Sequence, residues 1–174
     1  MGRHFDTLET RSAAERAQWL AIELPRQIAQ AQGLSGYGGR LDKFDARKIT
    51  RVEDLAQLPV LRKSDLGDAQ KSGAPFGGLT TRVPSGFSHI FQSPGPIYEP
   101  GGSEHDWWRM GRFLKAAGVG HGDIVQNCFG YHLTPAGTMF ENGARAVGAT
   151  VLPAGTGQTE LQVRAAQAAG ATAY

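Results

Sequence analysis

The stretch Ile124-Val-Gln-Asn-Cys-Phe129 is followed directly by Gly130-Tyr-His-Leu-Thr-Pro-Ala-Gly137. The first run is short and rich in apolar residues, which is typical of a strand buried in a parallel sheet. In the second run, Thr134 can cap a helix and Pro135 suits the first helical position. A strand, a loop and a helix are therefore predicted in immediate succession, which is the repeating unit of an α/β fold.

The same alternation continues to the last residue. Apolar residues at helical spacing run from Ala136 to Val147, and Gly148 ends this predicted helix. Thr150-Val-Leu152 is the next predicted strand, a further helix follows, and Ala171 to Tyr174 begin another strand. The fold class is therefore predicted as α/β, with strand-helix-strand-helix units of a parallel sheet in this half of the chain.

The first half of the chain favours helices joined by loops. Ser12-Ala-Ala-Glu15 has the spacing of a capping box, and the helix that it starts should be kinked or divided at Pro25 and end at Gly33. Thr50-Arg-Val-Glu53 repeats the capping-box spacing, and Ser64 is expected to cap another short helix. These patterns predict an N-terminal helical segment.

A boundary between two regions is expected near residue 87. Glycine and proline with few apolar residues fill Ser72 to Gly86, which favours a long surface loop. The predicted division is residues 1–87, with helices and loops, and residues 88–174, a partial α/β subdomain. Together they are expected to form one incomplete domain.

The stretch Phe91-Gln-Ser-Pro-Gly-Pro-Ile-Tyr-Glu-Pro100 lies just after this boundary. Ser88 to Gln92 have the pattern of a short strand, and Ser103 can cap a helix, so the stretch is predicted as a strand-to-helix connection. Such connections face the ligand crevice in open α/β sheets. Its three prolines lack backbone N–H groups, so the loop should be stiff and should bind an anion weakly.

Composition excludes several classes of function. The chain has 174 residues, 40% of them hydrophobic and 20% charged, which is typical of a globular protein. A net charge of +2 is too small to indicate nucleic-acid binding. Cys128 is the single cysteine, which favours a reducing compartment. Charged residues in the first twenty positions interrupt any apolar signal-peptide core, so a cytoplasmic protein without membrane association is expected.

Two loops after predicted strands hold the candidate ligand contacts. Tyr131 and His132 follow the strand that ends at Phe129, at the edge where α/β sheets bind ligands. A loop histidine is more often a surface or packing residue, and no catalytic partner for it is evident. After the next strand, Gly155 and Gly157 precede Thr159 as a helix cap, which can bind an anion through backbone donors. A tight turn without a ligand is about equally favoured, because the pattern lacks the third glycine of a dinucleotide fingerprint.

Four ordered segments resemble the N-terminal part of the phenylacetate-CoA ligase family, which belongs to the adenylate-forming acyl-CoA synthetases. The segments are Leu58–Leu66, Gly130–Gly137, Gly143–Gly148 and Gly157–Val163. The resemblance implies ATP-dependent conversion of an aryl acid to an acyl-adenylate and then to a CoA thioester. ATP, Mg²⁺ and coenzyme A are thus the cofactors implied for full-length relatives.

The resemblance also places an altered phosphate loop in this chain. The family loop has the form Ser-Ser-Gly-Thr-Thr-Gly-Lys-Pro, whereas this chain has Ser93-Pro-Gly-Pro-Ile-Tyr-Glu-Pro100. Ser93 and Gly95 agree with the pattern, but Glu99 stands where the family has lysine. A carboxylate about 4 Å from a phosphate would repel it by about 1 kcal/mol in water. Ser93, Gly95 and Glu99 are therefore the weak nucleotide-binding candidates.

The resemblance assigns no catalytic or metal-binding residue to this chain, and none of ATP, Mg²⁺ or coenzyme A is firmly expected to bind it. The later adenylation motifs and the catalytic lysine domain have no counterpart, so a truncated ligase-like protein that is inactive alone is expected. The alternative is a non-catalytic acid-binding or interaction module. An unrelated nucleotide-binding α/β domain is a third and less favoured hypothesis. A small carboxylic acid is the expected ligand, near Tyr131, His132 and the segment Gly155–Thr159. A homo-oligomer or a complementing chain is a further expected partner.

Overall fold

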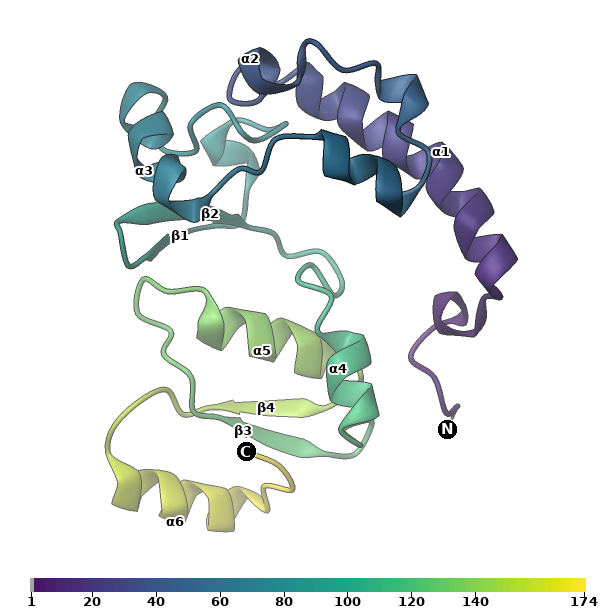
Figure 1. Cartoon of the computed structure of the whole chain (residues 1–174). Helices are drawn as coiled ribbons and strands as arrows, with labels where there is room; N and C mark the ends of the chain where they lie inside the picture. Colours follow the sequence, from purple (N-terminus) through teal and green to yellow (C-terminus); the bar gives the residue numbers. More distant parts are fainter. Residues whose placement is uncertain (1) are drawn as a thin grey trace. The chain divides into compact units, whose positions relative to one another are not determined.

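The computed structural model describes residues 2–174, which separate into two compact units (Figure 1). The helical unit comprises residues 11–86 and 94–98, and the sheet unit comprises residues 2–10, 87–93 and 99–174. The domain boundary expected near residue 87 stays a prediction.

The helical unit is built from helices and 3₁₀ turns around a small core. Its elements are α1 (Ala13–Gln32), α2 (Gly38–Leu41), η2 (Ala46–Lys48), η3 (Val52–Gln57), α3 (Lys63–Ser72) and η4 (Pro84–Gly86). Ile28, Ala46 and Ile49 form the buried cluster, against which Leu24 and Leu58 pack. Ile49 is only 2% exposed, so the amphipathic face of α1 is buried against the segment after α2.

The capping box predicted for α1 is confirmed. Ser12 Oγ accepts from the Glu15 backbone N–H at 3.2 Å, and Glu15 Oε2 accepts from the Ser12 N–H at 2.7 Å. The helix passes through Pro25 without being divided and ends immediately before Gly33. Burial of Ile28 one turn later offsets the backbone hydrogen bond that proline removes.

Two predicted helix starts in this unit are wrong in detail. Asp54 Oδ2, not the Glu53 carboxylate, accepts from the backbone N–H groups of Thr50 and Arg51, both at 3.0 Å. The capping box is therefore displaced by one residue, and the helix is 3₁₀. Ser64 lies inside α3 rather than capping it, because α3 already begins at Lys63.

The sheet unit has a parallel sheet between helices. Its elements are η1 (Thr7–Thr10), β1 (His89–Ser93), α4 (Gly111–Ala116), β3 (Ile124–Asn127), α5 (Ala136–Ala146), β4 (Thr150–Pro153) and α6 (Thr159–Ala169), together with part of β2 (Ile97–Gly101). β3 and β4 pair in parallel, from Ile124 opposite Thr150 to Asn127 opposite Pro153. Ala173 forms a parallel bridge with Val125, so β3 has a neighbour on each side. The predicted α/β class and its strand-helix alternation are confirmed.

Helices cover both faces of this sheet. Figure 1 shows α4 and α5 on one face of β3 and β4, and α6 on the other. The buried core on the α5 side contains Leu114, Ala144, Val147 and Ala149. A Cβ at Gly143 would lie 2.6 Å from the Met110 Cβ, so glycine allows α5 to approach the segment that leads into α4.

The stretch Phe91–Pro100 forms a β-hairpin, which corrects the predicted strand-to-helix connection. β1 and β2 are neighbours in a two-stranded sheet, joined by residues 94–96. Pro100 lies in β2 itself. In a two-stranded sheet each strand has a free edge, where a residue without an N–H group is tolerated.

The helix predicted to start at Ser103 begins eight residues later. Asp106 and Arg109 have φ values of 51° and 58°, and these left-handed residues prevent a helix between Ser103 and Gly111. Asp106 acts instead on the true helix start, because its Oδ1 accepts from the Gly111 N–H at 2.8 Å. Asp106 therefore binds the first N–H of α4, a role that the sequence pattern had given to Ser103.

Candidate functional site

The hairpin places two candidate nucleotide-binding residues against each other. The buried Ser93 hydroxyl donates to Glu99 Oε1 at 2.5 Å. Pro94 and Pro96 at the turn have no N–H group to offer. A triphosphate needs convergent donors, whereas this turn presents a carboxylate hydrogen-bonded to the serine that the family loop would use. The residues present therefore do not fit a triphosphate.

The tip of the hairpin is fixed within the helical unit by a residue that sequence reasoning missed. Gln70 on α3 is 7% exposed. Its Nε2 donates to the Tyr98 carbonyl at 2.8 Å, and its Oε1 accepts from the Tyr98 N–H at 2.9 Å. The side-chain amide thus imitates a neighbouring strand. Gly95 also belongs to the helical unit and is exposed, whereas Ser93 and Glu99 belong to the sheet unit.

Tyr131 is held by a half-buried hydrogen-bond network at the end of β3. Asn127 Nδ2 donates to the Tyr131 hydroxyl at 2.8 Å, and that hydroxyl donates to Glu141 Oε2 at 3.0 Å. A Cβ at Gly137 would lie 2.8 Å from the ring, so the ring packs directly on the first turn of α5. Burial raises the pKa of the Tyr131 hydroxyl above its usual range, and the Glu141 carboxylate adds to this rise. The hydroxyl is therefore neutral and fixes the loop.

The histidine of this loop has a different environment. His132 is exposed, and its carbonyl accepts from the Thr134 N–H at 2.7 Å. Thr134 was predicted as the cap of α5, but Pro135 holds that position and α5 starts at Ala136. The Thr134 hydroxyl donates instead to the Gly130 carbonyl at 3.4 Å, within the loop.

The loop after β4 is shaped by a glutamine on the following helix. Gln162 Nε2 donates to the carbonyls of Gly155 and Gly157, at 2.9 and 2.6 Å. Thr159 is the first residue of α6 rather than its cap, and Gln158 precedes it with a φ of 52°. The predicted threonine cap is wrong because the chain enters the helix through this left-handed residue.

The two loops and the hairpin base lie close together within the sheet unit. The Asn127 carbonyl accepts from the Ala154 and Gly155 N–H groups, both at 3.0 Å. A Cβ at Gly130 would lie 3.8 Å from a Thr156 methyl group. The Gln92 N–H, beside Ser93, donates to the Leu133 carbonyl, beside His132, at 2.9 Å.

The structure thus gathers four of the eight predicted site residues around the carboxyl ends of β3 and β4. These residues lie on this edge of the sheet or beside a residue that is hydrogen-bonded to it, and they are Ser93, Tyr131, His132 and Gly155. Asn127 connects the two loops, yet it was not singled out from the sequence. A polar residue at the end of an apolar strand is the signal that could have identified it.

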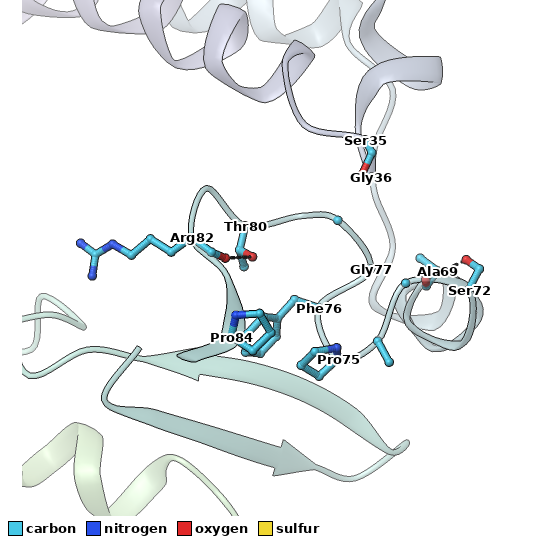
Figure 2. Close-up of a pocket in the computed structure, with 13 residues that line it drawn as sticks. Ser35, Gly36, Ala69, Ser72, Pro75, Phe76, Gly77, Thr80, Arg82 and Pro84 are labelled. Carbon is cyan, nitrogen blue, oxygen red and sulfur yellow. Dashed lines mark hydrogen bonds between the residues drawn. The ribbon is translucent and has the colours of Figure 1, made fainter. Parts of the chain in front are cut away.

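A separate hollow of about 640 Å³ lies in the helical unit, between α3 and the segment after it (Figure 2). Several of its polar groups already form hydrogen bonds within the lining. The hydroxyls of Ser72 and Thr80 donate to carbonyls of its own lining at 3.0 and 2.9 Å. The N–H groups of Gly36 and Gly77 also donate to lining carbonyls, at 3.1 and 2.6 Å. Figure 2 shows the Arg82 guanidinium directed away from the other labelled residues. The hollow is therefore a poor anion site.

The described part of the chain has neither a metal-binding cluster nor a membrane-spanning helix. Residues 2–174 contain no group of three or more histidine, cysteine or acidic side chains that could hold a metal ion. No helix within the same residues is long and apolar enough to cross a membrane.

Sequence comparison identifies relatives of the chain. It is 35% identical over 123 residues to a phenylacetate-coenzyme A ligase of Pseudomonas putida. It is 32% identical over 126 residues to the enzyme of that name in Thermus thermophilus, and 33% over 134 residues to that of Escherichia coli. The chain belongs to the phenylacetate-CoA ligase family. No protein-family model matches it.

The match covers most of this chain and a minor part of each family member. Between 67% and 70% of the chain aligns with these three ligases, and the aligned region spans 27% to 30% of their length. The resemblance seen in the four sequence segments is confirmed. The activity and substrates of a whole ligase are therefore not shown for this chain.

Solved structures confirm the fold. The crystal structure of 2-hydroxyisobutyryl-CoA ligase in complex with 2-HIB-AMP and CoA gives a TM-score of 0.79 at 22% identity, covering 95% of this chain and 37% of that one. The same ligase with R3-HIB-AMP gives a TM-score of 0.79 at 23% identity, with 95% and 35% covered. The chain thus has the fold of part of an acyl-CoA ligase.

Proposed function

We propose that this chain forms the N-terminal part of the adenylation domain of a carboxylic acid-CoA ligase-like protein, and that residues 1–174 alone form no acyl-adenylate. The sequence match to four phenylacetate-coenzyme A ligases carries the first half of this proposal. An aryl acid related to phenylacetate is the proposed substrate class of the whole protein. ATP, Mg²⁺ and coenzyme A are its proposed co-substrates and cofactor.

The Ser93–Glu99 hydrogen bond supports the second half of the proposal. Stabilising the transferred phosphorus requires donors and positive charge held in place before reaction. This hairpin has a carboxylate at the position of the family lysine, and the serine hydroxyl donates to that carboxylate at 2.5 Å. A triphosphate at this turn would displace the hydrogen bond and meet Glu99.

The carboxyl ends of β3 and β4 support an acid site in the same unit. The Tyr131 hydroxyl is hydrogen-bonded to Asn127 and Glu141, so it stabilises the conformation of the loop. The exposed His132 and the loop Gly155–Thr159 remain as the proposed contacts of the acid. Gly155 and Gly157 add no side chains to this loop.

The activity half of the proposal is tested by pyrophosphate release. The purified chain is incubated with ATP, Mg²⁺, coenzyme A and phenylacetate, and pyrophosphate is measured against a reaction without acid. Equal release in both reactions is expected. Acid-dependent release would overturn the proposal that residues 1–174 are inactive alone.

A non-catalytic acid-binding module is the second candidate function, and the altered hairpin favours it. Thermal shift with phenylacetate and with ATP separates it from a protein without a ligand. A rise with phenylacetate but not with ATP supports the module. A rise with ATP that exceeds the rise with phenylacetate would contradict it.

A further inference from the structure

The side chain of Asn127, the last residue of β3, is polar but almost completely buried. The residue is 3% exposed. It lies on the same face of the strand as Val125, which packs against the core on the α5 side. A buried amide without hydrogen-bond partners would destabilise the fold. Asn127 is therefore accommodated here through the hydrogen bonds that its amide makes.

The amide of Asn127 holds the loop between β3 and α5, residues 128–135, and the start of α5. Its Nδ2 donates to the Tyr131 hydroxyl at 2.8 Å and to the Gly137 carbonyl at 2.7 Å. Its Oδ1 accepts from the Phe129 N–H at 3.2 Å. A flipped amide would place two acceptors together at Gly137 and two donors together at Phe129, so the orientation of the amide is fixed.

The main chain of the same residue holds the loop between β4 and α6, residues 154–158. The Asn127 carbonyl accepts from the N–H groups of Ala154 and Gly155, both at 3.0 Å. Each loop is thus hydrogen-bonded to a different part of one residue. A displacement of Asn127 would therefore move both loops.

A role in packing alone does not require an amide at this position. An apolar side chain would fill the same buried volume without the cost of removing an amide from water. A fully hydrogen-bonded polar network instead selects one conformation of the segments that it joins. Such support is needed where two loops must be held precisely for binding.

We propose that Asn127 is the positioning residue of the acid site. Its amide sets the loop that carries His132, and its carbonyl sets the segment Gly155–Thr159, so that a carboxylic acid meets both contacts together. Asn127 itself touches no ligand, because it is buried. This inference rests on the proposed acid site. A merely structural residue would affect the stability of the protein but not the affinity of its folded state.

The substitution Asn127→Asp tests the amide, with phenylacetate binding measured by calorimetry at pH 8 and pH 5.5. Each affinity is compared with that of the wild type at the same pH. An ionised carboxylate cannot donate to the Tyr131 hydroxyl or the Gly137 carbonyl, so the affinity should fall about tenfold at pH 8. A neutral carboxyl can donate once, so part of the loss should be recovered at pH 5.5.

The introduced carboxyl should change its charge between these two pH values. Burial raises its pKa, and so does the carboxylate of Glu141, which shares the Tyr131 hydroxyl. An affinity equal to that of the wild type at both pH values overturns the proposal. A loss that is the same at both pH values also overturns it, because the missing donor would then not be the cause.

Asn142→Asp is the matched control within the sheet unit. The Asn142 amide donates to the Glu104 carbonyl at 3.1 Å and makes no hydrogen bond to either loop among residues 2–174. This variant should bind phenylacetate as the wild type does at both pH values. An equal loss of affinity in the two variants contradicts a specific role for Asn127.

A titration of the wild type with phenylacetate, followed by amide chemical shifts, tests the proposal if Asn127→Asp does not fold. The N–H groups of Phe129 and Gly155 are both bonded to Asn127, so they should shift with the same midpoint as His132. A shift of His132 without these two refutes the role of Asn127 alone. No shift at any of the three residues refutes the acid site itself.

Discussion

Substitution of Gly137 by alanine tests how the candidate site is held together. The added Cβ would lie 2.8 Å from two carbons of the Tyr131 ring and 2.9 Å from the Gly130 carbonyl oxygen. The ring must therefore move, which lengthens its hydrogen bonds to Asn127 and Glu141. Overpacking of this kind costs about 1–3 kcal/mol, and two weakened hydrogen bonds add about 1 kcal/mol.

Alanine also has a higher helix propensity than glycine, by about 1 kcal/mol in a helix interior. The net expectation is that Gly137→Ala lowers the free energy of unfolding by about 1–3 kcal/mol. Gly67→Ala is the matched control on α3, where the nearest atom to an added Cβ is 3.8 Å away. That variant should be unchanged or more stable by up to about 1 kcal/mol.

Urea unfolding followed by tryptophan fluorescence measures both variants, because Trp107 and Trp108 report on the sheet unit and Trp19 on the helical unit. Hydrogen exchange of the Tyr131 amide provides a local readout. If Gly137→Ala were as stable as the wild type and exchanged no faster at Tyr131, the packing of the ring on α5 would be refuted.

Three further changes give separate tests. Gln70→Leu leaves the Tyr98 N–H and carbonyl without partners and should cost about 2 kcal/mol in urea unfolding, with faster exchange of the Tyr98 amide; unchanged exchange would contradict the clamp. The Thr172 hydroxyl, and then the Gly120 N–H, lower the pKa of the Asp123 carboxyl in the folded protein. The ionised Asp123 therefore stabilises the fold above the pKa of the unfolded state, and this stabilisation is lost as the pH falls through the lower pKa of the folded state. Asp123→Asn should therefore reduce the melting temperature at neutral pH and approach the wild type in acid, and a difference independent of pH would exclude this linkage. Glu99→Lys removes a repulsion of about 1 kcal/mol and should tighten ATP binding about fivefold in calorimetry; no gain would show that charge is not the limiting defect.

Local sequence patterns predicted the order of β3, α5, β4 and α6 because the signals of these elements are short-range. The apolar run at Ile124 and the helix stop at Gly148 depend on neighbouring residues, and in the structure β3 begins at Ile124 and α5 ends at Ala146, two residues before Gly148. The left-handed backbone at Asp106 was not predictable, since only the hydrogen bond to Gly111 reveals why a non-glycine residue is tolerated there.

The hairpin shows why part of the candidate site was not predictable from the sequence. Three prolines between Ser93 and Pro100 favoured an irregular loop, but a two-stranded sheet leaves edges where proline costs no ladder bond. The Ser93–Glu99 bond depends on pairing of the two strands, and the Gln70 clamp joins residues 28 apart in sequence. Such contacts follow from tertiary structure and not from spacing.

Gln162, which donates to two carbonyls of the loop after β4, also affects which residues of this loop can be substituted. Because Gln162 on α6 fixes the path at Gly155 and Gly157, the intervening Thr156 is exposed and contributes little to that path. Its side chain can be exchanged while the backbone keeps its course. Position 156 can therefore accept other side chains without loss of the fold.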